Sequence, residues 1–294
     1  MFPDYPDNSC YALVNNRRLH YLEGGNDNPE TVVMLHGNPS WSFYFRHLFT
    51  SLVKKYHCIV PDHIGMGLSD KPANGEYEFT LQQRVDDLDA LLSSLKIDNK
   101  LTLIVHDWGG MIGLAYATRY PDKIKRIVIS NTAGFHIPES KQIPWQLKLS
   151  RTPIIGAILI QGLNLFCRGA VIQCVTRQPM SRAVKDAYLS PYDSWSHRLS
   201  VLRFVEDIPL DKGHPSYDLV DQVEKALAML STLPVLICWG LNDFVFDGNY
   251  LDEWKKRMPN AEIHEFDAGH YLLEDAGDEV IPIIKIFLEK NPIG

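Results

Sequence analysis

Val105-His106-Asp107-Trp108-Gly109-Gly110 joins an apolar run to a glycine-rich segment, and this stretch decides how the rest of the chain is interpreted. The run before it, residues 101–105, is typical of a buried strand, and a helix is expected from about Gly109 to a point before Pro121. A polar residue between a strand and a helix with small neighbours is the pattern of a nucleophile elbow. That position usually holds serine, whereas here it holds Asp107.

The elbow alone leaves two interpretations of Asp107 open. An aspartate at the start of a helix is also a common N-terminal cap, because its carboxylate accepts backbone N–H bonds there. No intact G-x-S-x-G motif occurs elsewhere in the chain. A carboxylate nucleophile therefore has to be supported by the residues that would work with it.

Segments on both sides of the elbow alternate between strand and helix patterns. A tight hairpin is expected across Asn15 and Asn16, since asparagine tolerates positive φ. Alternation of this kind implies a mostly parallel, twisted sheet with helices on both faces. The expected strands are residues 10–13, 18–22, 32–35, 57–60, 101–105, 124–129, 235–239 and 261–266, and the expected helices include 40–55, 80–95 and 275–289.

The strand pattern disappears between residues 134 and 212. This segment is rich in Trp, Leu, Ile and Pro at helical spacing, which indicates an inserted helical cap. The sequence thus predicts an α/β-hydrolase fold with a core domain formed by residues 1–133 and 213–294 and a cap, or lid, domain formed by residues 134–212. No internal repeat or low-complexity linker is visible.

Two further polar residues follow expected strands and complete a catalytic triad with Asp107. Asp243 lies in GLNDFVF (240–246) and His270 lies in DAGHYLLED (267–275). In this fold a triad runs in the order nucleophile, acid, histidine, and open parallel sheets assemble their sites at the carboxyl ends of their strands. Asp247 remains an alternative acid, and a surface loop is the alternative location for His270.

The triad suggests a division of chemical work. The reference pKa of an aspartate is about 3.9, so Asp107 is ionised at neutral pH and needs no base for its first attack. His270 is expected to act later by deprotonating a water that hydrolyses the ester on Asp107, while Asp243 orients the imidazole.

Two side chains are candidates for stabilising a leaving group, an oxyanion or a halide. The amide of Asn38 and the indole N–H of Trp108 can both donate to an anion, and the backbone N–H groups beside them can form an oxyanion hole. The competing interpretations are a turn residue for Asn38 and a core aromatic for Trp108.

Bulk composition excludes several classes of protein. A net charge of −7 without a dense basic run excludes nucleic acid as the main partner. The acidic start, MFPDYPDNSC, lacks the features of a secretory signal, so we expect a cytoplasmic protein. Five cysteines without a C-x-x-C pair are expected to be reduced, and we expect neither a metal nor another cofactor. The apolar stretch 153–175 is interrupted by Gly, Asn and Arg and is expected to form two short helices rather than a transmembrane segment.

The assembled motifs resemble those of the haloalkane dehalogenases. These enzymes carry a His-Gly-Asn-Pro loop and an Asp-Trp-Gly elbow, which match residues 36–39 and 106–110. Fluoroacetate dehalogenases normally have Arg at the position of Trp108. Epoxide hydrolases share the elbow but usually carry an aromatic residue at the position of Asn38 and need two cap tyrosines, for which Tyr188 and Tyr192 are candidates.

One branch of the dehalogenase group has a catalytic Glu after the strand that ends near residue 129, where this chain has Ser130 and Asn131. Asp243 is therefore the acid that the resemblance favours. The pattern is similar to the third haloalkane dehalogenase subfamily, whose members include β-lactone decarboxylases of bacterial long-chain olefin biosynthesis. The resemblance covers essentially the whole chain, and the segments that carry it include PDHIGMGLSDKP (61–72), SPYDSW (190–195), RFVEDIPL (203–210) and WGLNDFVFD (239–247).

The resemblance implies a small hydrophobic substrate, a cis-β-lactone with two long alkyl chains, which is converted to an olefin and carbon dioxide. It also implies partner enzymes of the same pathway. Two hydrolytic alternatives remain, a haloalkane dehalogenase using the same five residues and, with less support, an epoxide hydrolase. A ligand-binding protein with a vestigial hydrolase site is a further alternative from a different class.

Overall fold

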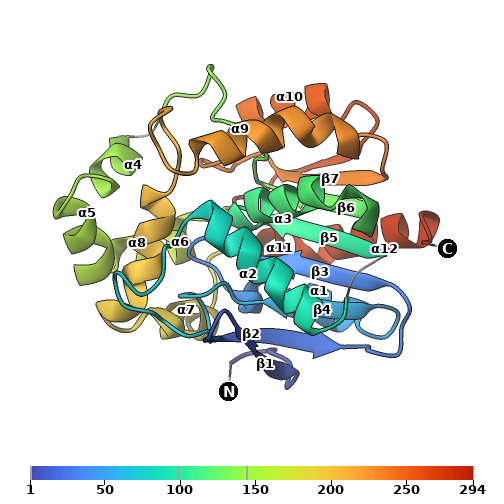
Figure 1. Ribbon diagram of the computed structural model, residues 1–294, viewed down its shortest axis with the longest axis horizontal. Coiled ribbons are helices and arrows are strands. Elements are labelled where there is room, and N and C mark those ends of the chain that lie inside the picture. Colours follow the sequence, from blue (N-terminus) through green and yellow to red (C-terminus); the bar gives the residue numbers. More distant parts are fainter. Residues whose placement is uncertain (1, 98–99, 144, 294) are drawn as a thin grey trace.

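A single eight-stranded sheet organises the computed structural model, which describes residues 2–97, 100–143 and 145–293 (Figure 1). The strand order is β1-β2-β4-β3-β5-β6-β7-β8, in which the β1–β2 and β2–β4 pairs are antiparallel and the remaining neighbours run parallel. The strands are β1 (Ser9–Val14), β2 (Arg17–Gly24), β3 (Thr31–Leu35), β4 (His57–Pro61), β5 (Leu101–His106), β6 (Ile124–Ser130), β7 (Val235–Gly240) and β8 (Glu262–Phe266). The predicted mostly parallel sheet is confirmed.

The first hairpin forms as its sequence predicts. Asn15 and Asn16 have φ angles of 48° and 62°. Both lie in the left-handed region that a two-residue turn of this type requires, and asparagine adopts it at little cost. Val14 consequently pairs with Arg17 across the turn.

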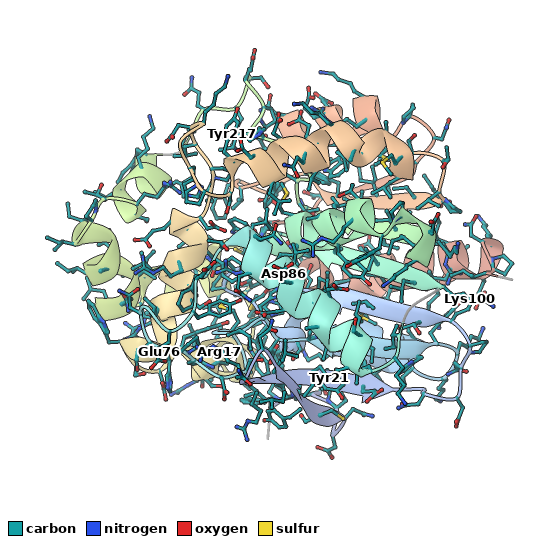
Figure 2. The ribbon with its side chains drawn as sticks, in the orientation of Figure 1. Arg17, Tyr21, Glu76, Asp86, Lys100 and Tyr217 are labelled. Carbon is teal, nitrogen blue, oxygen red and sulfur yellow. The ribbon has the colours of Figure 1, made fainter. Side chains whose placement is uncertain are left out.

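Helices cover both faces of the sheet, with α2, α3 and α9 on one face and α1 and α12 on the other (Figure 1). Side chains fill the space between these layers, and every residue of β3 and β5 is buried (Figure 2). The helices are α1 (Arg46–Leu52), α2 (Leu81–Ser94), α3 (Trp108–Arg119), α9 (Tyr217–Ala226), α10 (Gly248–Arg257), α11 (Leu272–Asp275) and α12 (Gly277–Lys290).

Several helix boundaries differ from the sequence-based expectation. The helix expected over 40–55 starts as the 3₁₀ turn η1 (Ser42–Phe45) and becomes α-helical only at Arg46. The closing helix is divided at Ala276 into α11 and α12. Helices α9 and α10 were not anticipated, because each buries only a few side chains and is otherwise polar.

Only helices and turns occur between β6 and the end of α8 in the part of the chain that the structure describes. They lie at one end of the molecule, beside the sheet (Figure 1). The elements are α4 (Trp145–Ser150), α5 (Ile155–Ala157), η3 (Ile158–Gly162), α6 (Leu165–Gln173), α7 (Arg182–Leu189), η4 (Ser190–Tyr192), η5 (Ser196–Arg198) and α8 (Leu199–Glu206).

The apolar stretch 153–175 forms two short helical pieces, as expected. Residues Ile155–Gly162 and Leu165–Gln173 are bent by 63° relative to each other. Asn164, which has a φ of 54°, lies at the break. Among the described residues no single helix is long and apolar enough to cross a membrane, whereas this bent pair meets the criterion by length and composition only.

Candidate active site

Asp107 lies in a strained turn between β5 and α3, at the carboxyl edge of the sheet. Its backbone has a φ of 51° and a ψ of −129°, which a residue with a side chain rarely adopts. The Thr132 hydroxyl donates a hydrogen bond to the Asp107 carbonyl, and the Asp107 N–H donates to the carbonyl of Asn131. The surrounding structure therefore holds the strained turn in place.

Close packing against backbone and side-chain atoms explains the glycines around this turn. A Cβ atom on Gly109 would lie 2.0 Å from the carbonyl oxygen of Leu35, and one on Gly110 would lie 1.8 Å from the Thr132 hydroxyl oxygen. A Cβ on Gly37, in the loop after β3, would lie 1.9 Å from Oδ1 of Asp107. Only glycine at these positions lets the elbow and the loop approach each other.

The two oxygens of Asp107 have different surroundings. Oδ1 accepts a hydrogen bond of 2.5 Å from the Asn38 N–H, and the Trp108 N–H also bonds the carboxylate. Oδ2 lies 3.6 Å from Nε2 of His270, which is too long for a direct hydrogen bond. Burial raises the pKa of Asp107 above its usual value, against the opposing effects of His270 and the two backbone N–H groups.

His270 is oriented by Asp243. Its Nδ1 lies 2.7 Å from Oδ2 of Asp243, and both side chains are buried. Oδ1 of Asp243 accepts from the N–H groups of Val245 and Phe246, at 2.6 and 3.1 Å. Burial lowers the pKa of His270, but the carboxylates of Asp243 and Asp107 outweigh it, so the pKa is raised above the usual value. The structure thus brings the side chains of the three predicted triad residues together.

Asp247, the alternative acid, is engaged elsewhere. Its carboxylate caps α10 by accepting from the Asn249 N–H at 3.1 Å, and it forms an ion pair of 2.7 Å with Lys141. Its side chain is about one-third exposed. These contacts account for Asp247 without a role beside His270.

Asn131 is a supporting residue that the sequence analysis did not identify. Its amide Nδ2 donates to Oδ2 of Asp243 at 2.9 Å and to the carbonyl of Gly240, while its Oδ1 accepts from the Gly240 N–H. The side chain is fully buried and has a backbone φ of 36°. Asn131 therefore links the ends of β6 and β7 and fixes the carboxylate that orients His270. Its position directly after a strand was the available signal.

The Asn38 and Trp108 side chains lie beside cap helix α8. One N–H of the Asn38 amide donates to the carbonyl of Val201 at 3.1 Å, and the ring of Trp108 lies 5.3 Å from that of Phe204. No residue in the described ranges accepts a hydrogen bond from the Trp108 indole N–H. The indole N–H is thus available to a ligand, whereas the Asn38 amide already uses one of its two hydrogens.

Tyr188 and Tyr192 do not hydrogen bond Asp107. The Tyr188 hydroxyl donates to Glu274 at 2.6 Å, and the Tyr192 hydroxyl donates to the carbonyl of Ser40 at 3.2 Å. Both side chains are buried. The paired tyrosines that an epoxide hydrolase needs are therefore committed to other partners.

A second buried histidine, His106, contacts the backbone of His270. Nε2 of His106 donates to the backbone carbonyl of His270 at 2.8 Å, and the two rings lie 4.6 Å apart. Burial and the neighbouring His270 hold the pKa of His106 well below its usual value, so this ring is neutral. His106 directly precedes the elbow, but nothing in the sequence distinguished it from an ordinary strand residue.

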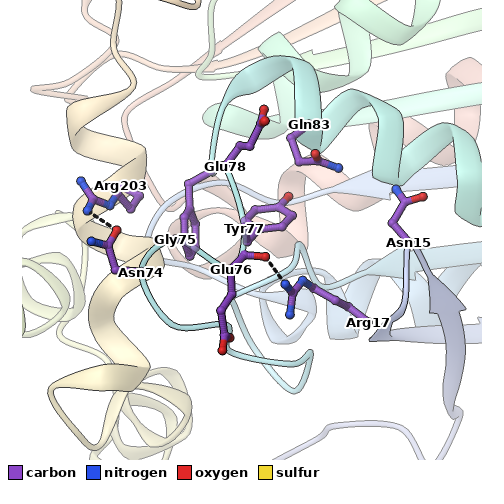
Figure 3. Close-up of a pocket in the computed structure, with 10 residues that line it drawn as sticks. Asn15, Arg17, Asn74, Gly75, Glu76, Tyr77, Glu78, Gln83 and Arg203 are labelled. Carbon is purple, nitrogen blue, oxygen red and sulfur yellow. Dashed lines mark hydrogen bonds between the residues drawn. The ribbon is translucent and has the colours of Figure 1, made fainter.

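A separate surface pocket of about 460 Å³ lies between the β1–β2 hairpin, the loop before α2, and α8 (Figure 3). Arg203 donates to Oδ1 of Asn74 at 2.7 Å, and Arg17 donates to the carbonyl of Glu76. Both cations are thus paired with protein oxygens. None of the triad residues lines this pocket.

The cysteine thiols and the possible metal-ligating side chains were compared with the geometry of disulfides and metal sites. Within residues 2–97, 100–143 and 145–293, no cluster of three or more His, Cys, Asp or Glu side chains is arranged to hold a metal ion. All five cysteines are unpaired.

An eight-stranded sheet with a residue of strained backbone after β5 defines an α/β hydrolase, and the family model for the α/β hydrolase fold matches residues 30–162. The chain is 52% identical over 278 residues to the cis-3-alkyl-4-alkyloxetan-2-one decarboxylase of Shewanella oneidensis, covering 94% of this chain and 87% of that protein. It is 46% identical over 281 residues to the enzyme of the same name from Xanthomonas campestris pv. campestris, covering 94% and 93%.

Among solved structures, a haloalkane dehalogenase from Bradyrhizobium elkani matches with a TM-score of 0.82 and 25% identity, covering 96% of this chain and 99% of that one. The two decarboxylases are far more similar in sequence. Within the α/β hydrolases, the chain therefore belongs to the family of these decarboxylases.

Proposed function

We propose that this protein converts a cis-3-alkyl-4-alkyloxetan-2-one, a β-lactone with two alkyl chains, to an olefin and carbon dioxide, with Asp107 as the nucleophile. The observation that carries the proposal is identity of 52% and 46% over nearly the full chain to two decarboxylases of that name. The grouping of Asp107, His270 and Asp243 at one edge of the sheet supports a working site rather than a vestigial one.

The surroundings of Asp107 support a specific role for each group. Oδ2 is the attacking atom, because Oδ1 is already held by the Asn38 N–H. The raised pKa of Asp107 reflects a carboxylate deprived of water, which makes it a better nucleophile. The Trp108 indole and the second N–H of the Asn38 amide supply donors for the oxygen that departs from carbon.

The reaction balances without water or a redox partner. Attack of Asp107 on ring carbon C4 breaks the C4–O1 bond and leaves a carboxylate attached to C3. Loss of carbon dioxide then breaks the C2–C3 bond, forms the C3=C4 double bond and returns the electron pair of the ester C–O bond to Asp107. His270, held by Asp243, faces Oδ2 of Asp107.

Hydrolytic dehalogenation is the second candidate, and the fold shared with the Bradyrhizobium dehalogenase favours it. In that reaction Asp107 displaces halide to form an alkyl ester, and His270 deprotonates the water that cleaves it. The Asn38 amide and the Trp108 indole would bind the halide, but one hydrogen of the amide is bonded to Val201. Dehalogenation needs water and a base, whereas decarboxylation needs neither.

A side-by-side assay tests the two candidates. We expect purified protein to release olefin from a cis-β-lactone faster than it releases halide from a long bromoalkane or iodoalkane. The reverse ranking contradicts the proposal, and inactivity toward both substrates favours a ligand-binding protein. In dehalogenation, oxygen from ¹⁸O-labelled water should enter the Asp107 carboxylate in the first turnover and the alcohol in later turnovers. In decarboxylation, it should enter neither the olefin nor the carbon dioxide at the moment of release.

Variants of the triad sharpen this assay. With a bromoalkane, His270→Ala should accumulate an alkyl ester on Asp107 that intact mass spectrometry detects, because general-base help worth about 10²- to 10⁴-fold is lost. Asp243→Asn should lose activity, and the matched variant Asp247→Asn should keep it. Equal losses in these two variants contradict the assignment of Asp243.

Other features of the chain remain proposals. The division into a core of residues 1–133 and 213–294 and a cap of residues 134–212 is supported by the eight strands, all of which lie in the two core ranges. A cytoplasmic location and association with other enzymes of olefin biosynthesis stay predictions.

A further inference from the structure

The outer surface of the cap carries an unusual group of exposed apolar side chains. Ile154 is 76% exposed, Ile172 is 65% exposed and Trp195 is 52% exposed. We call this group the cap patch, and its members are Ile154, Ile155, Ile158, Leu163, Leu165, Ile172 and Trp195.

The members of the cap patch lie on neighbouring elements. Ile154 directly precedes α5, and its carbonyl accepts a hydrogen bond of 2.9 Å from the Ile158 N–H, so the two residues are neighbours. Leu165 and Ile172 share the exposed stripe of α6 with Arg168, and η3 packs against both α5 and α6. The Trp195 ring lies beside Gly162, where an added Cβ would be 3.5 Å from it.

The segment that carries most of the cap patch has charges of one sign. Residues 141–185 contain seven Lys and Arg residues and no Asp or Glu, although the whole chain has a net charge of −7. Several of these cations are paired, as in the ion pair of Lys141 with Asp247. Lys148 and Arg168 are exposed and form no ion pair with any residue that the structure describes.

We propose that the cap patch docks on an anionic lipid surface. Exposed Ile, Leu and Trp side chains beside Lys and Arg form the combination that binds a membrane interface. Six of the seven patch members lie in the segment that lacks Asp and Glu, and Trp195 lies outside it, near the exposed Asp193. Anionic headgroups attract the positive segment, whereas a second copy of the patch would repel it. The two helical pieces are bent by 63°, which suits shallow insertion of both pieces rather than a crossing.

The docked orientation would bring the site close to the lipid. Helix α8 contacts both Asn38 and Trp108, so the cap lies directly beside the elbow. A substrate with two long alkyl chains would dissolve in that lipid, a consequence that rests on the proposed function. The binding itself does not depend on which substrate the site uses.

Vesicle flotation tests the proposal without substrate. Wild-type protein should float with vesicles that contain phosphatidylglycerol, much less with vesicles of phosphatidylcholine alone, and less again at high salt. Ile154→Asp and Arg168→Glu should each lower the bound fraction about fivefold or more. Ile154 has a φ of 70°, which aspartate tolerates better than isoleucine, so the first variant should fold.

Matched controls distinguish docking through the cap patch from nonspecific binding of exposed apolar side chains to vesicles. Met229 is 53% exposed on the core turn η6 (Leu227–Leu230), and Met229→Asp should float like wild type. Three results would overturn the proposal: no flotation of the wild type, equal flotation with neutral vesicles, or unchanged flotation of Ile154→Asp. A mass in solution that falls from dimer to monomer in Ile154→Asp, with no flotation, would make the patch an interface between copies.

Discussion

The turns that follow β4 and β5 each carry a buried aspartate, yet the two carboxylates have opposite characters. Both Asp62 oxygens are occupied: Oδ1 accepts from the Ser42 N–H at 2.7 Å, and Oδ2 lies 2.8 Å from both His20 Nδ1 and the Leu68 N–H. In Asp107 only Oδ1 is held in this way, and Oδ2 faces His270 across 3.6 Å.

The pKa values of Asp62 and Asp107 differ because the two carboxylates have different hydrogen-bond partners and neighbouring charges. Burial alone would raise the pKa of Asp62, but His20, His36 and the Leu68 N–H outweigh it and hold the pKa at about 2. For Asp107, burial outweighs its partners and raises the pKa. Hydrogen-bond donors therefore decide whether a buried aspartate at this sheet edge stabilises the fold or stays reactive.

Substituting the reactive carboxylate should give the largest effect. Asp107→Asn keeps the shape of the side chain but removes the nucleophile, so olefin release should fall by about 10⁴-fold or more. Stability should stay level or rise, because a carboxylate whose pKa is raised by folding opposes folding at neutral pH. Turnover and thermal unfolding measure the two effects. Retained turnover in Asp107→Asn, or a large loss of its stability, would contradict the conclusion that Asp107 is the reactive carboxylate and Asp62 the stabilising one.

Substituting the other carboxylate should give the reverse pattern. Asp62→Asn should lower the free energy of unfolding by about 3 kcal/mol while the protein that remains folded keeps its turnover. The folded-state pKa lies below the usual 3.8, so the stability difference should be full above pH 4 and shrink as the pH falls toward 2.

Urea denaturation of wild type and Asp62→Asn at neutral and acidic pH measures this change. Asp86→Asn is the control, because Asp86 forms an exposed ion pair with Arg119 and should matter by less than about 1 kcal/mol. Equal effects of the two substitutions would show that hydrogen bonds to Asp62 contribute little.

The smallest expected effect is on pH dependence. The pKa of His270 is raised above 6.5, so the neutral imidazole that hydrolysis needs is depleted below that pKa. The steady-state rate of halide release, which is limited by ester hydrolysis when His270 is protonated, should fall about tenfold per pH unit on the acid side of a midpoint above 6.5. The rate of olefin release should not show this decrease at acidic pH, because decarboxylation needs no base. A midpoint below 6.5, or identical profiles for both reactions, would contradict the assigned roles of His270.

The positions of the triad residues could be predicted from the sequence, because local glycine and strand patterns indicate where the chain turns. The glycines after Asp107 predicted the elbow, and the apolar runs before Asp243 and His270 predicted that both residues follow strands. The structure brings these three side chains together. The chain also contains Asp62 in a similar position, and only the elbow pattern distinguished Asp107 from it.

The remaining features depend on contacts that no local pattern encodes. Asn131 holds Asp243, which is 112 residues away in the chain, and His106 supports His270 across 164 residues. The bond from the Asn38 amide to Val201 arises from how the cap docks on the core. Helix α10 buries only Tyr250, Leu251 and Trp254, which is too narrow a stripe to stand out by periodicity.

The contact between Gly37 and Asp107 also bears on how activity appears during folding. The N–H that holds the Asp107 carboxylate belongs to a residue 69 positions earlier, and the two segments meet only when β3 pairs with β5. Neither segment carries a reactive geometry by itself. Catalytic competence should therefore emerge with the central strand pairing, a long-range and intrinsically slow event, and not with the early local turns.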